Sequence, residues 1–320
     1  MLIEDRIRVE RSDVIAARER IGGLVERTPL IESEVAGAKV WLKCECLQAG
    51  GAFKLRGATN RLLQLSPEER GRGVVAFSSG NHARGVAIAA RRLGIRAVIV
   101  MPADAPRVKI EGTEAEGAEI VLYDRRSESR EEIAARIAGD SGATVVPSFA
   151  DPAIIAGQGT AGLEIVEQLG RSPSQIVIPC GGGGLASGIA LAAPDAVIVI
   201  VEPEGWDDVG RSLERGEIVS VAPDAPNTIC DAIMTPRAAP ITFGILRERH
   251  ARALSVSDAE VEQAVRFAWE NHGLVVEPGG AAGLAALTSG KLAPAADTVV
   301  VLSGGNVDPA LHARIIAERA

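Results

Sequence analysis

Residues 176–188 read IVIPCGGGGLASG, and this stretch decides the fold. Its β-branched start, residues 176–178, is typical of a buried parallel strand. The glycines Gly181, Gly182, Gly183 and Gly184 can adopt positive φ angles and let backbone N–H groups approach an anion without a Cβ in the way. The next residues, SGIALAA, suit a helix whose N-terminal dipole points at the same place. The stretch therefore predicts a strand, a tight turn and a helix start that together hold a phosphate.

The glycine pattern alone leaves the ligand open. Gly181, Gly183 and Ala186 also satisfy the relaxed dinucleotide pattern G-x-G-x-x-A. Glu202 follows about twenty residues later, where an acid would bind ribose. A nicotinamide-dependent dehydrogenase is thus an alternative to an enzyme with another phosphorylated cofactor.

Composition limits the class of protein. A chain of 320 residues with 47% hydrophobic content can bury a large core, and its length favours two domains. The net charge of −8 argues against nucleic acid or an anionic membrane as partner. The N-terminal residues 1–10 mix charges with aliphatic side chains, so we expect a cytoplasmic protein without a leader or membrane span. The four cysteines lack zinc spacing and are expected to be reduced, buried thiols.

Strand-like and helix-like segments alternate along the chain, which is typical of parallel α/β architecture. We expect two doubly wound open-sheet domains, with a small substrate-gating domain at 67–148 and a large cofactor-binding domain formed by 1–66 plus 149–320. Gly279 and Gly280 are interpreted as a turn, and the proline-rich stretch 223–241 as a loop over the surface or the site. Strands are predicted at 39–46, 74–77, 97–101, 119–123, 144–146, 176–178, 197–201 and 298–302, and helices at 13–21, 81–93, 106–116, 127–138, 153–169 and after a capping box at 257–260.

Lys54 is the first candidate for chemistry. It lies in AGGAFKLRGATN, near a predicted helix start, in a chain with only five lysines beside 29 arginines. A helix N-terminus disfavours an ammonium, so the pKa of Lys54 should fall toward the range where a neutral amine acts as nucleophile or base. The alternative is a surface lysine that follows a turn.

A second candidate site is the run Ser78, Ser79, Gly80, Asn81 and His82, which follows a predicted strand and opens a helix. Backbone N–H groups and small hydroxyls can hold a carboxylate at such a place, and the same residues also suit a helix cap. The His82 ring lacks any metal or catalytic spacing and is expected to be structural. A phosphate site, a reactive lysine and a carboxylate-binding helix start together describe pyridoxal phosphate chemistry on amino acids.

Six motifs then resemble one family. LKCECLQAGGAFKLRGA, SSGNHARGVA, AGQGTAGLE, PCGGGGLASG, VEPGGAAGLAAL and LSGGNVD occur in order across nearly the whole chain and are similar to the serine/threonine dehydratase and serine racemase family of fold-type II pyridoxal phosphate enzymes. The resemblance implies a tryptophan synthase β-like fold with the cofactor in the cleft between the two domains, and a homodimer. It also implies that the C-terminal regulatory domain of biosynthetic threonine deaminases is absent.

The resemblance assigns roles by matching position. Lys54 corresponds to the Schiff-base lysine, Ser79 to the racemases' second acid/base, and Ser303 to the partner of the pyridine nitrogen. The remaining matches are Phe53 beside the cofactor ring, Asn81 at the ring hydroxyl, the glycines with Leu185 at the phosphate, Arg130 near the substrate, and Glu202, Asp208 and the Trp206 carbonyl at Mg²⁺ or Ca²⁺.

The implied reaction is that of an ammonia-lyase. It would eliminate water from L-threonine, L-serine, 3-hydroxyaspartate or 3-phenylserine and give a 2-keto acid and ammonium. Where the family reads TGSFK this chain has GGAFK at 50–54, and the loss of two hydroxyls leaves the preferred substrate open. A serine racemase of the same fold, the nicotinamide dehydrogenase and a non-catalytic amino-acid sensor are the alternatives.

Overall fold

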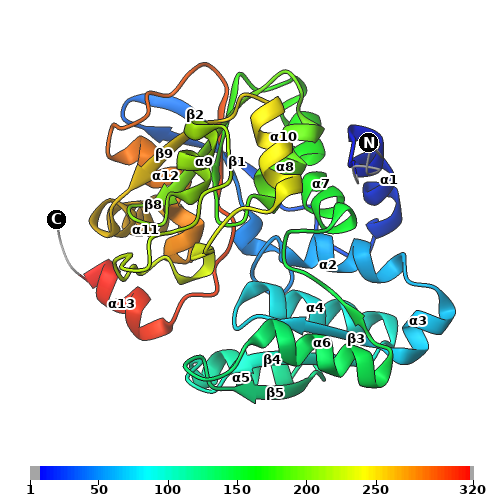
Figure 1. Cartoon of the computed structure of the whole chain (residues 1–320). Coiled ribbons are helices and arrows are strands. Elements are labelled where there is room, and N and C mark those ends of the chain that lie inside the picture. Colours follow the sequence, from blue (N-terminus) through cyan, green and yellow to red (C-terminus); the bar gives the residue numbers. More distant parts are fainter. Residues whose placement is uncertain (1–7, 318–320) are drawn as a thin grey trace.

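The strands fall into two sheets, one of six strands and one of four (Figure 1). The computed structural model describes residues 8–317. Residues 1–7, on which the predicted absence of a leader partly depends, lie outside the described part. The six-stranded sheet has the order β1-β2-β10-β7-β8-β9, and the four-stranded sheet has the order β5-β4-β3-β6. The strands are β1 (Leu30–Val35), β2 (Ala38–Lys43), β3 (Val74–Phe77), β4 (Ala97–Pro102), β5 (Glu119–Tyr123), β6 (Thr144–Val145), β7 (Gln175–Pro179), β8 (Val197–Pro203), β9 (Arg252–Val256) and β10 (Thr298–Val301).

All neighbouring strands run parallel except the β1–β2 hairpin, which is antiparallel. This confirms the predicted α/β class with two parallel-sheet domains, while the residue boundaries of the domains stay a prediction. The helices are α1 (Arg11–Ile21), α2 (Lys54–Leu63), α3 (Pro67–Arg72), α4 (Asn81–Leu93), α5 (Arg107–Glu114), α6 (Arg130–Ser141), α7 (Pro152–Leu169), α8 (Gly184–Ala192), α9 (Asp208–Arg215), α10 (Pro240–Glu248), α11 (Asp258–His272), α12 (Pro278–Thr288) and α13 (Pro309–Ala317), with short 3₁₀ turns η1 (Glu45–Leu47) and η2 (Asp231–Ile233).

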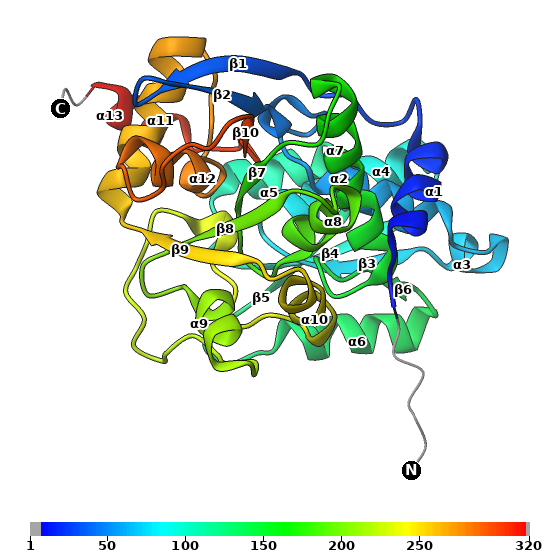
Figure 2. The same ribbon diagram turned by 90° about the horizontal axis from the view of Figure 1, so that it is seen from above.

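The central strand β7 lies between β10 and β8, and every residue of it is buried (Figure 2). Two helices, α7 and α8, pack closely beside it because glycines form their contact. A Cβ on Gly159 would come within 2.6 Å of the Gly188 carbonyl oxygen. This close packing fixes the position of α8, whose first residue is Gly184.

The small domain carries α4 on its four-stranded sheet. Eight of the 13 residues of α4 are buried, mostly alanine, valine and isoleucine that pack against β3, β4 and α2. The helix begins directly after the loop that follows β3, as the sequence predicts. Asn81, its first residue, therefore lies at the carboxyl end of a parallel strand.

The predicted turn at Gly279 and Gly280 is wrong, because both residues lie inside α12. Pro278 begins this helix, and the glycines serve close packing instead of a turn. A Cβ on Gly280 would overlap the Gly304 carbonyl oxygen. The expectation of positive φ along the glycine run is also too broad, because only Gly183 among the four glycines has one, at 82°.

Four charged side chains are buried where α2 packs on the large domain. Arg56 Nε is 2.8 Å from Glu45 Oε2, and Arg56 Nη1 is 2.7 Å from Glu164 Oε1. Lys43 Nζ is 2.6 Å from the second Glu164 oxygen and also donates to the Thr28 carbonyl. We call Lys43, Glu45, Arg56 and Glu164 the Arg56 cluster. It ties α2 to β2, η1 and α7 from the side of the large domain.

Two further observations bear on the expected class. All four cysteines are free and buried, as predicted. Between residues 8 and 317, no helix combines the length and the apolarity that crossing a bilayer requires.

Candidate active site between the two domains

Lys54 is the first residue of α2, where the sequence places it. Its ammonium donates to the Ser148 carbonyl oxygen at 3.1 Å and lies 5.1 Å from the centre of the Phe53 ring. Burial lowers the pKa of Lys54 to about 8, against the opposing effect of the Glu277 carboxylate. The direction is the predicted one, but the main cause is loss of water and not the helix dipole. Near pH 7 about a tenth of this amine is then neutral, far more than for an ordinary lysine, and the neutral amine is the form that a nucleophile or base requires.

The Glu277 carboxylate acts on this lysine through its charge, and it was not singled out from the sequence. It is buried at the start of α12, and Asn81 Nδ2 donates to its Oε1 at 2.5 Å. Burial raises the pKa of Glu277 to about 7, although the hydrogen bond from Asn81 opposes the rise. The motif VEPGG contains this residue, but only the folded chain brings it to Asn81, 196 residues away.

Asn81 joins the two domains through both ends of its amide. Its Oδ1 accepts from Asn306 Nδ2 at 2.8 Å, and Asn306 in turn accepts from Arg84 Nη1 at 3.0 Å. One Nδ2 proton of Asn81 goes to Glu277, so the second remains free to donate to a ligand. The side chain is thereby oriented from two directions.

The four glycines form a cradle at the start of α8. A Cβ on Gly182 would come within 2.5 Å of the Phe149 ring, and one on Gly181 within 2.8 Å of Thr235 Oγ1. Side chains are therefore excluded here, and the backbone N–H groups at the start of α8 are open to an anion. Leu185 follows as a buried residue that packs into the core. This arrangement fits a phosphate group.

Ser303 and Phe53 lie side by side in the backbone, since the Phe53 amide donates to the Ser303 carbonyl oxygen at 3.2 Å. The Ser303 side chain is buried, and its hydroxyl makes no hydrogen bond within residues 8–317. The hydroxyl oxygen itself is not enclosed by protein, so it is open to a partner such as a ring nitrogen. With the glycine cradle and the buried amine of Lys54, the residues present fit pyridoxal phosphate.

The predicted carboxylate site lies at the start of α4. Gly80 is the residue before the helix, and its amide donates to Ser78 Oγ at 3.3 Å; Ser79 lies between them. His82 is buried in the first turn of α4, and its ring bonds to the backbone. Its Nε2 is 2.9 Å from the Val146 carbonyl oxygen, and burial lowers the pKa of His82 to about 3, with a further contribution from Lys54.

Arg130 lies at the start of α6 and stacks 5.6 Å from the centre of the Phe77 ring, at the end of β3. Its Nε donates to Glu131 Oε1 at 2.9 Å. The guanidinium is therefore near the Ser78 loop but already paired with a carboxylate on the surface.

Glu202 and Asp208 come together at the end of β8. Both Glu202 oxygens accept backbone N–H bonds, from Val209 at 3.1 Å and from Gly210 at 2.8 Å, so this buried carboxylate is unsuited to the ribose role considered above. Burial raises the pKa of Asp208 to about 7 and that of Glu202 well above its usual value. Asp208 Oδ2 is buried without a hydrogen-bond partner in the described residues. Within residues 8–317, no three acidic, histidine or cysteine side chains gather as a metal site, so a cation here would depend on Asp208, Glu202 and a backbone oxygen such as the Trp206 carbonyl.

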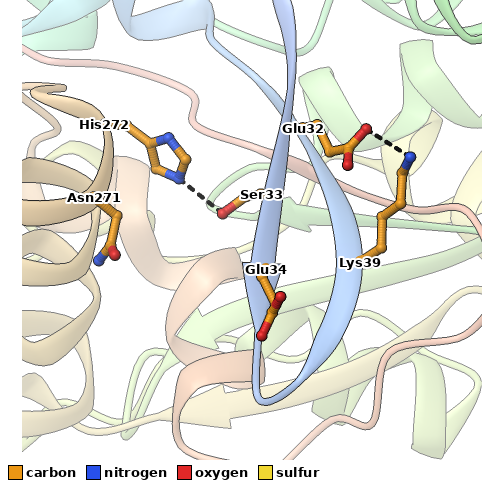
Figure 3. Close-up of a pocket in the computed structure, with 6 residues that line it drawn as sticks. All are labelled: Glu32, Ser33, Glu34, Lys39, Asn271 and His272. Carbon is orange, nitrogen blue, oxygen red and sulfur yellow. Dashed lines mark hydrogen bonds and ion pairs between the residues drawn. The ribbon is translucent and has the colours of Figure 1, made fainter.

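A separate surface pocket of about 410 Å³ lies on the far edge of the large sheet (Figure 3). It is lined by β1, β2 and the end of α11, and none of the predicted site residues belongs to it. His272 Nε2 is 2.7 Å from Ser33 Oγ, but between residues 8 and 317 no carboxylate bonds the other ring nitrogen. The pair therefore lacks the third group of a hydrolase triad.

Comparison with known proteins agrees with this geometry. The family model described as "Pyridoxal-phosphate dependent enzyme" matches residues 21–304. An L-threo-3-hydroxyaspartate ammonia-lyase from Pseudomonas sp. is 44% identical over 95% of this chain and 97% of its own. A serine racemase from Schizosaccharomyces pombe is 40% identical over 96% and 97%. Among solved structures, maize serine racemase has a TM-score of 0.89 and 36% identity, covering 97% of each chain.

Proposed function

This chain belongs to the family of pyridoxal-phosphate dependent enzymes, and from that premise we propose that it is an ammonia-lyase that converts a β-hydroxy amino acid into a 2-keto acid and ammonium. The family excludes the nicotinamide dehydrogenase considered from the glycine pattern. The observation that carries the proposal is the buried amine of Lys54, whose pKa is lowered to about 8 and whose residue packs against Gly85 of α4. Similar chains named as ammonia-lyases of hydroxyaspartate and threonine support it.

The protein's own groups have distinct tasks in this reaction. Backbone N–H groups of the glycine cradle hold the phosphate, the free Nδ2 proton of Asn81 orients the ring oxygen, and the Ser303 hydroxyl meets the ring nitrogen. The start of α4 binds the substrate carboxylate. When bound, pyridoxal phosphate withdraws electrons from the substrate's α-carbon and makes its proton acidic.

Lys54 then acts as the base. Its amine anchors the cofactor before substrate arrives and, once released, takes the α-proton, for which a pKa of about 8 is well placed. The β-hydroxyl takes up a proton, which the protonated Lys54 amine can return, and leaves as water; the enamine product tautomerises and is hydrolysed by one water to the 2-keto acid and ammonium. A neutral hydroxyl at Ser303 does not protonate the ring nitrogen strongly, and this favours elimination over reactions that need a longer-lived carbanion. Glu277 positions Asn81 and lies close enough to Lys54 to affect its charge.

The second candidate function is racemisation, which the serine racemases among the relatives favour. A racemase needs another acid/base on the face away from Lys54, and Ser79 is the matching residue. Elimination from an L-substrate needs the lysine alone. Removing one acid/base group costs on the order of 10²–10⁴ in rate, so the two functions predict separable outcomes.

The test compares the cofactor-loaded wild type with Ser79→Ala on L- and D-serine, L-threonine and L-threo-3-hydroxyaspartate. Keto acid and the chirality of remaining substrate are both read. We expect Ser79→Ala to keep much of the keto acid production from the L-isomer and to lose epimerisation and elimination from the D-isomer. The control is Ser141→Ala on the surface of α6. A loss of L-elimination as complete as in Lys54→Ala, with cofactor still bound, would contradict the one-base mechanism.

A divalent cation is a further part of the proposal. Glu202 and Asp208 would hold Mg²⁺ or Ca²⁺, with the Trp206 carbonyl as a third ligand. The site would lie behind the glycine cradle, since both acids raise the pKa of Cys180, the residue before Gly181. The homodimer and the cytoplasmic location expected from the sequence stay predictions.

A further inference from the structure

One ion pair crosses between the two domains beside the site. Lys109, on α5 of the small domain, donates its ammonium to Asp231 Oδ2, on η2 of the large domain. Within residues 8–317, no other ion pair joins the part of the chain that forms the four-stranded sheet with the part that forms the six-stranded sheet. The pair has no task in the reaction described above.

Packing places this pair at the edge of the site. A Cβ on Gly181 would come within 2.9 Å of the Ile233 carbonyl oxygen, and one on Gly279 within 3.3 Å of Ile233 Cγ1. The turn η2 therefore lies between the glycine cradle and the start of α12, where Glu277 is buried. The charges of Lys109, Asp231 and Lys54 all change the pKa of Glu277, so all three groups lie near the Glu277 carboxylate.

The two partners differ in exposure. The Lys109 side chain is 22% exposed and the Asp231 side chain 54%. The cation thus lies deeper, where its interaction with an anion is less screened. An ion pair with so exposed a member is weak, so another carboxylate can replace Asp231 at little cost.

Substrates of the proposed lyase differ in whether they carry a second carboxylate that could replace Asp231 as the partner of Lys109. The α-carboxylate is expected at the start of α4, so serine and threonine leave Lys109 without an anion of their own. A dicarboxylic substrate such as 3-hydroxyaspartate carries a second carboxylate on its β-carbon. We propose that Lys109 is a specificity-determining residue that binds this distal carboxylate, taking it in place of Asp231.

Arg130 is the other cation near the substrate loop, and it is less suited to the task. Its side chain is 40% exposed and bonded to Glu131, its neighbour in the sequence, whose pKa it lowers. Its charge is thus engaged on the surface of α6, whereas that of Lys109 acts at Glu277. The inference rests on the proposed lyase function, and its test separates the two.

The experiment measures kcat/KM for L-threo-3-hydroxyaspartate and for L-serine with the cofactor-loaded wild type, Lys109→Met and Arg130→Met. Lys39→Met, a lysine of the β1–β2 hairpin paired with Glu32, is the control. Loss of a charge-assisted hydrogen bond should lower kcat/KM for hydroxyaspartate by about 10- to 10²-fold in Lys109→Met. The value for L-serine should change by less than about threefold. Equal losses on both substrates, or a selective loss only in Arg130→Met, overturn the assignment.

A binding measurement makes the inference independent of turnover. Calorimetric titration of the holoenzyme with succinate and with propionate compares a dicarboxylate with a monocarboxylate. Lys109→Met should weaken succinate by about tenfold or more and leave propionate unchanged. Asp231→Asn removes the competing carboxylate and should tighten succinate. If Asp231→Asn weakens succinate binding as much as Lys109→Met does, the ion pair only holds the two domains together and the proposal is wrong. If the wild type turns over neither amino acid, the lyase function fails while the succinate result still decides the role of Lys109.

Discussion

Replacing Glu277 with glutamine should stabilise the protein at pH 8 and have little effect at pH 5. The pKa of Glu277 is about 7, against an ordinary value of 4.5. One pKa unit corresponds to about 1.36 kcal/mol, so ionising this buried carboxyl removes about 3 kcal/mol from the free energy of unfolding. The magnitude follows from burial, because the hydrogen bond from Asn81 only partly compensates for the lost water.

The sign follows from which protonation state the fold prefers. A pKa raised in the folded protein means that the protonated form is favoured there, so the contribution is complete below about pH 4.5 and is lost as the pH rises through about 7. A glutamine at position 277 does not ionise, and its Oε1 can still accept the hydrogen bond from Asn81. The variant should therefore exceed the wild type by up to about 3 kcal/mol at pH 8 and by less than about 1 kcal/mol at pH 5.

The assay is urea denaturation of the cofactor-loaded proteins at both pH values. Glu270→Gln, an exposed change on α11, is the control and should show no pH-dependent difference from the wild type. A Glu277→Gln protein that gains nothing at pH 8 would refute the buried-acid reasoning. So would a gain of the same size at both pH values, because that would indicate better packing and not relief from a charge.

Two predictions concern the cofactors. Lys54→Ala should abolish turnover, and borohydride should no longer attach pyridoxal phosphate to the protein; labelling through another lysine would show that the anchor is misassigned. Removing divalent ions with a chelator should lower the melting temperature, because the buried Asp208 Oδ2 then has no partner beside the Glu202 carboxyl, and Mg²⁺ or Ca²⁺ should restore it. An unchanged melting temperature in both steps argues that no cation is held there.

Local patterns in the sequence were enough to predict most of the core. The strand at 74–77 and the helix at 81–93 have the bounds that the sequence predicts, because a short β-branched run and a long alanine-rich helix are strongly patterned. The strand β9 was missed, since its five residues are only half-buried at the sheet edge and lack a strong period. The helix α12 was read as a turn because two glycines opened it, and their reason is contact with Gly304 from another part of the chain.

The candidate site was predictable where one segment carries the chemistry and not where distant segments meet. Lys54 and the glycine cradle each stand in a local pattern of glycines, strand and helix. Glu277 acquires its raised pKa mainly through burial in the folded chain, and Lys109 pairs with Asp231 only when the domains come together. No local sequence pattern predicts these contacts, since the two partners in each are more than a hundred residues apart.

The Arg56 cluster has a consequence for how the holoenzyme forms. Arg56 follows Lys54 by two residues, and its guanidinium is held by Glu45 and Glu164 with no contribution from a ligand. Taking away one member would leave a buried charge unbalanced, at a cost of about 3–5 kcal/mol. We therefore expect Lys54 to have the same position in the apoprotein. Pyridoxal phosphate would then bind without having to order this part of the chain, which lowers the entropic cost of binding.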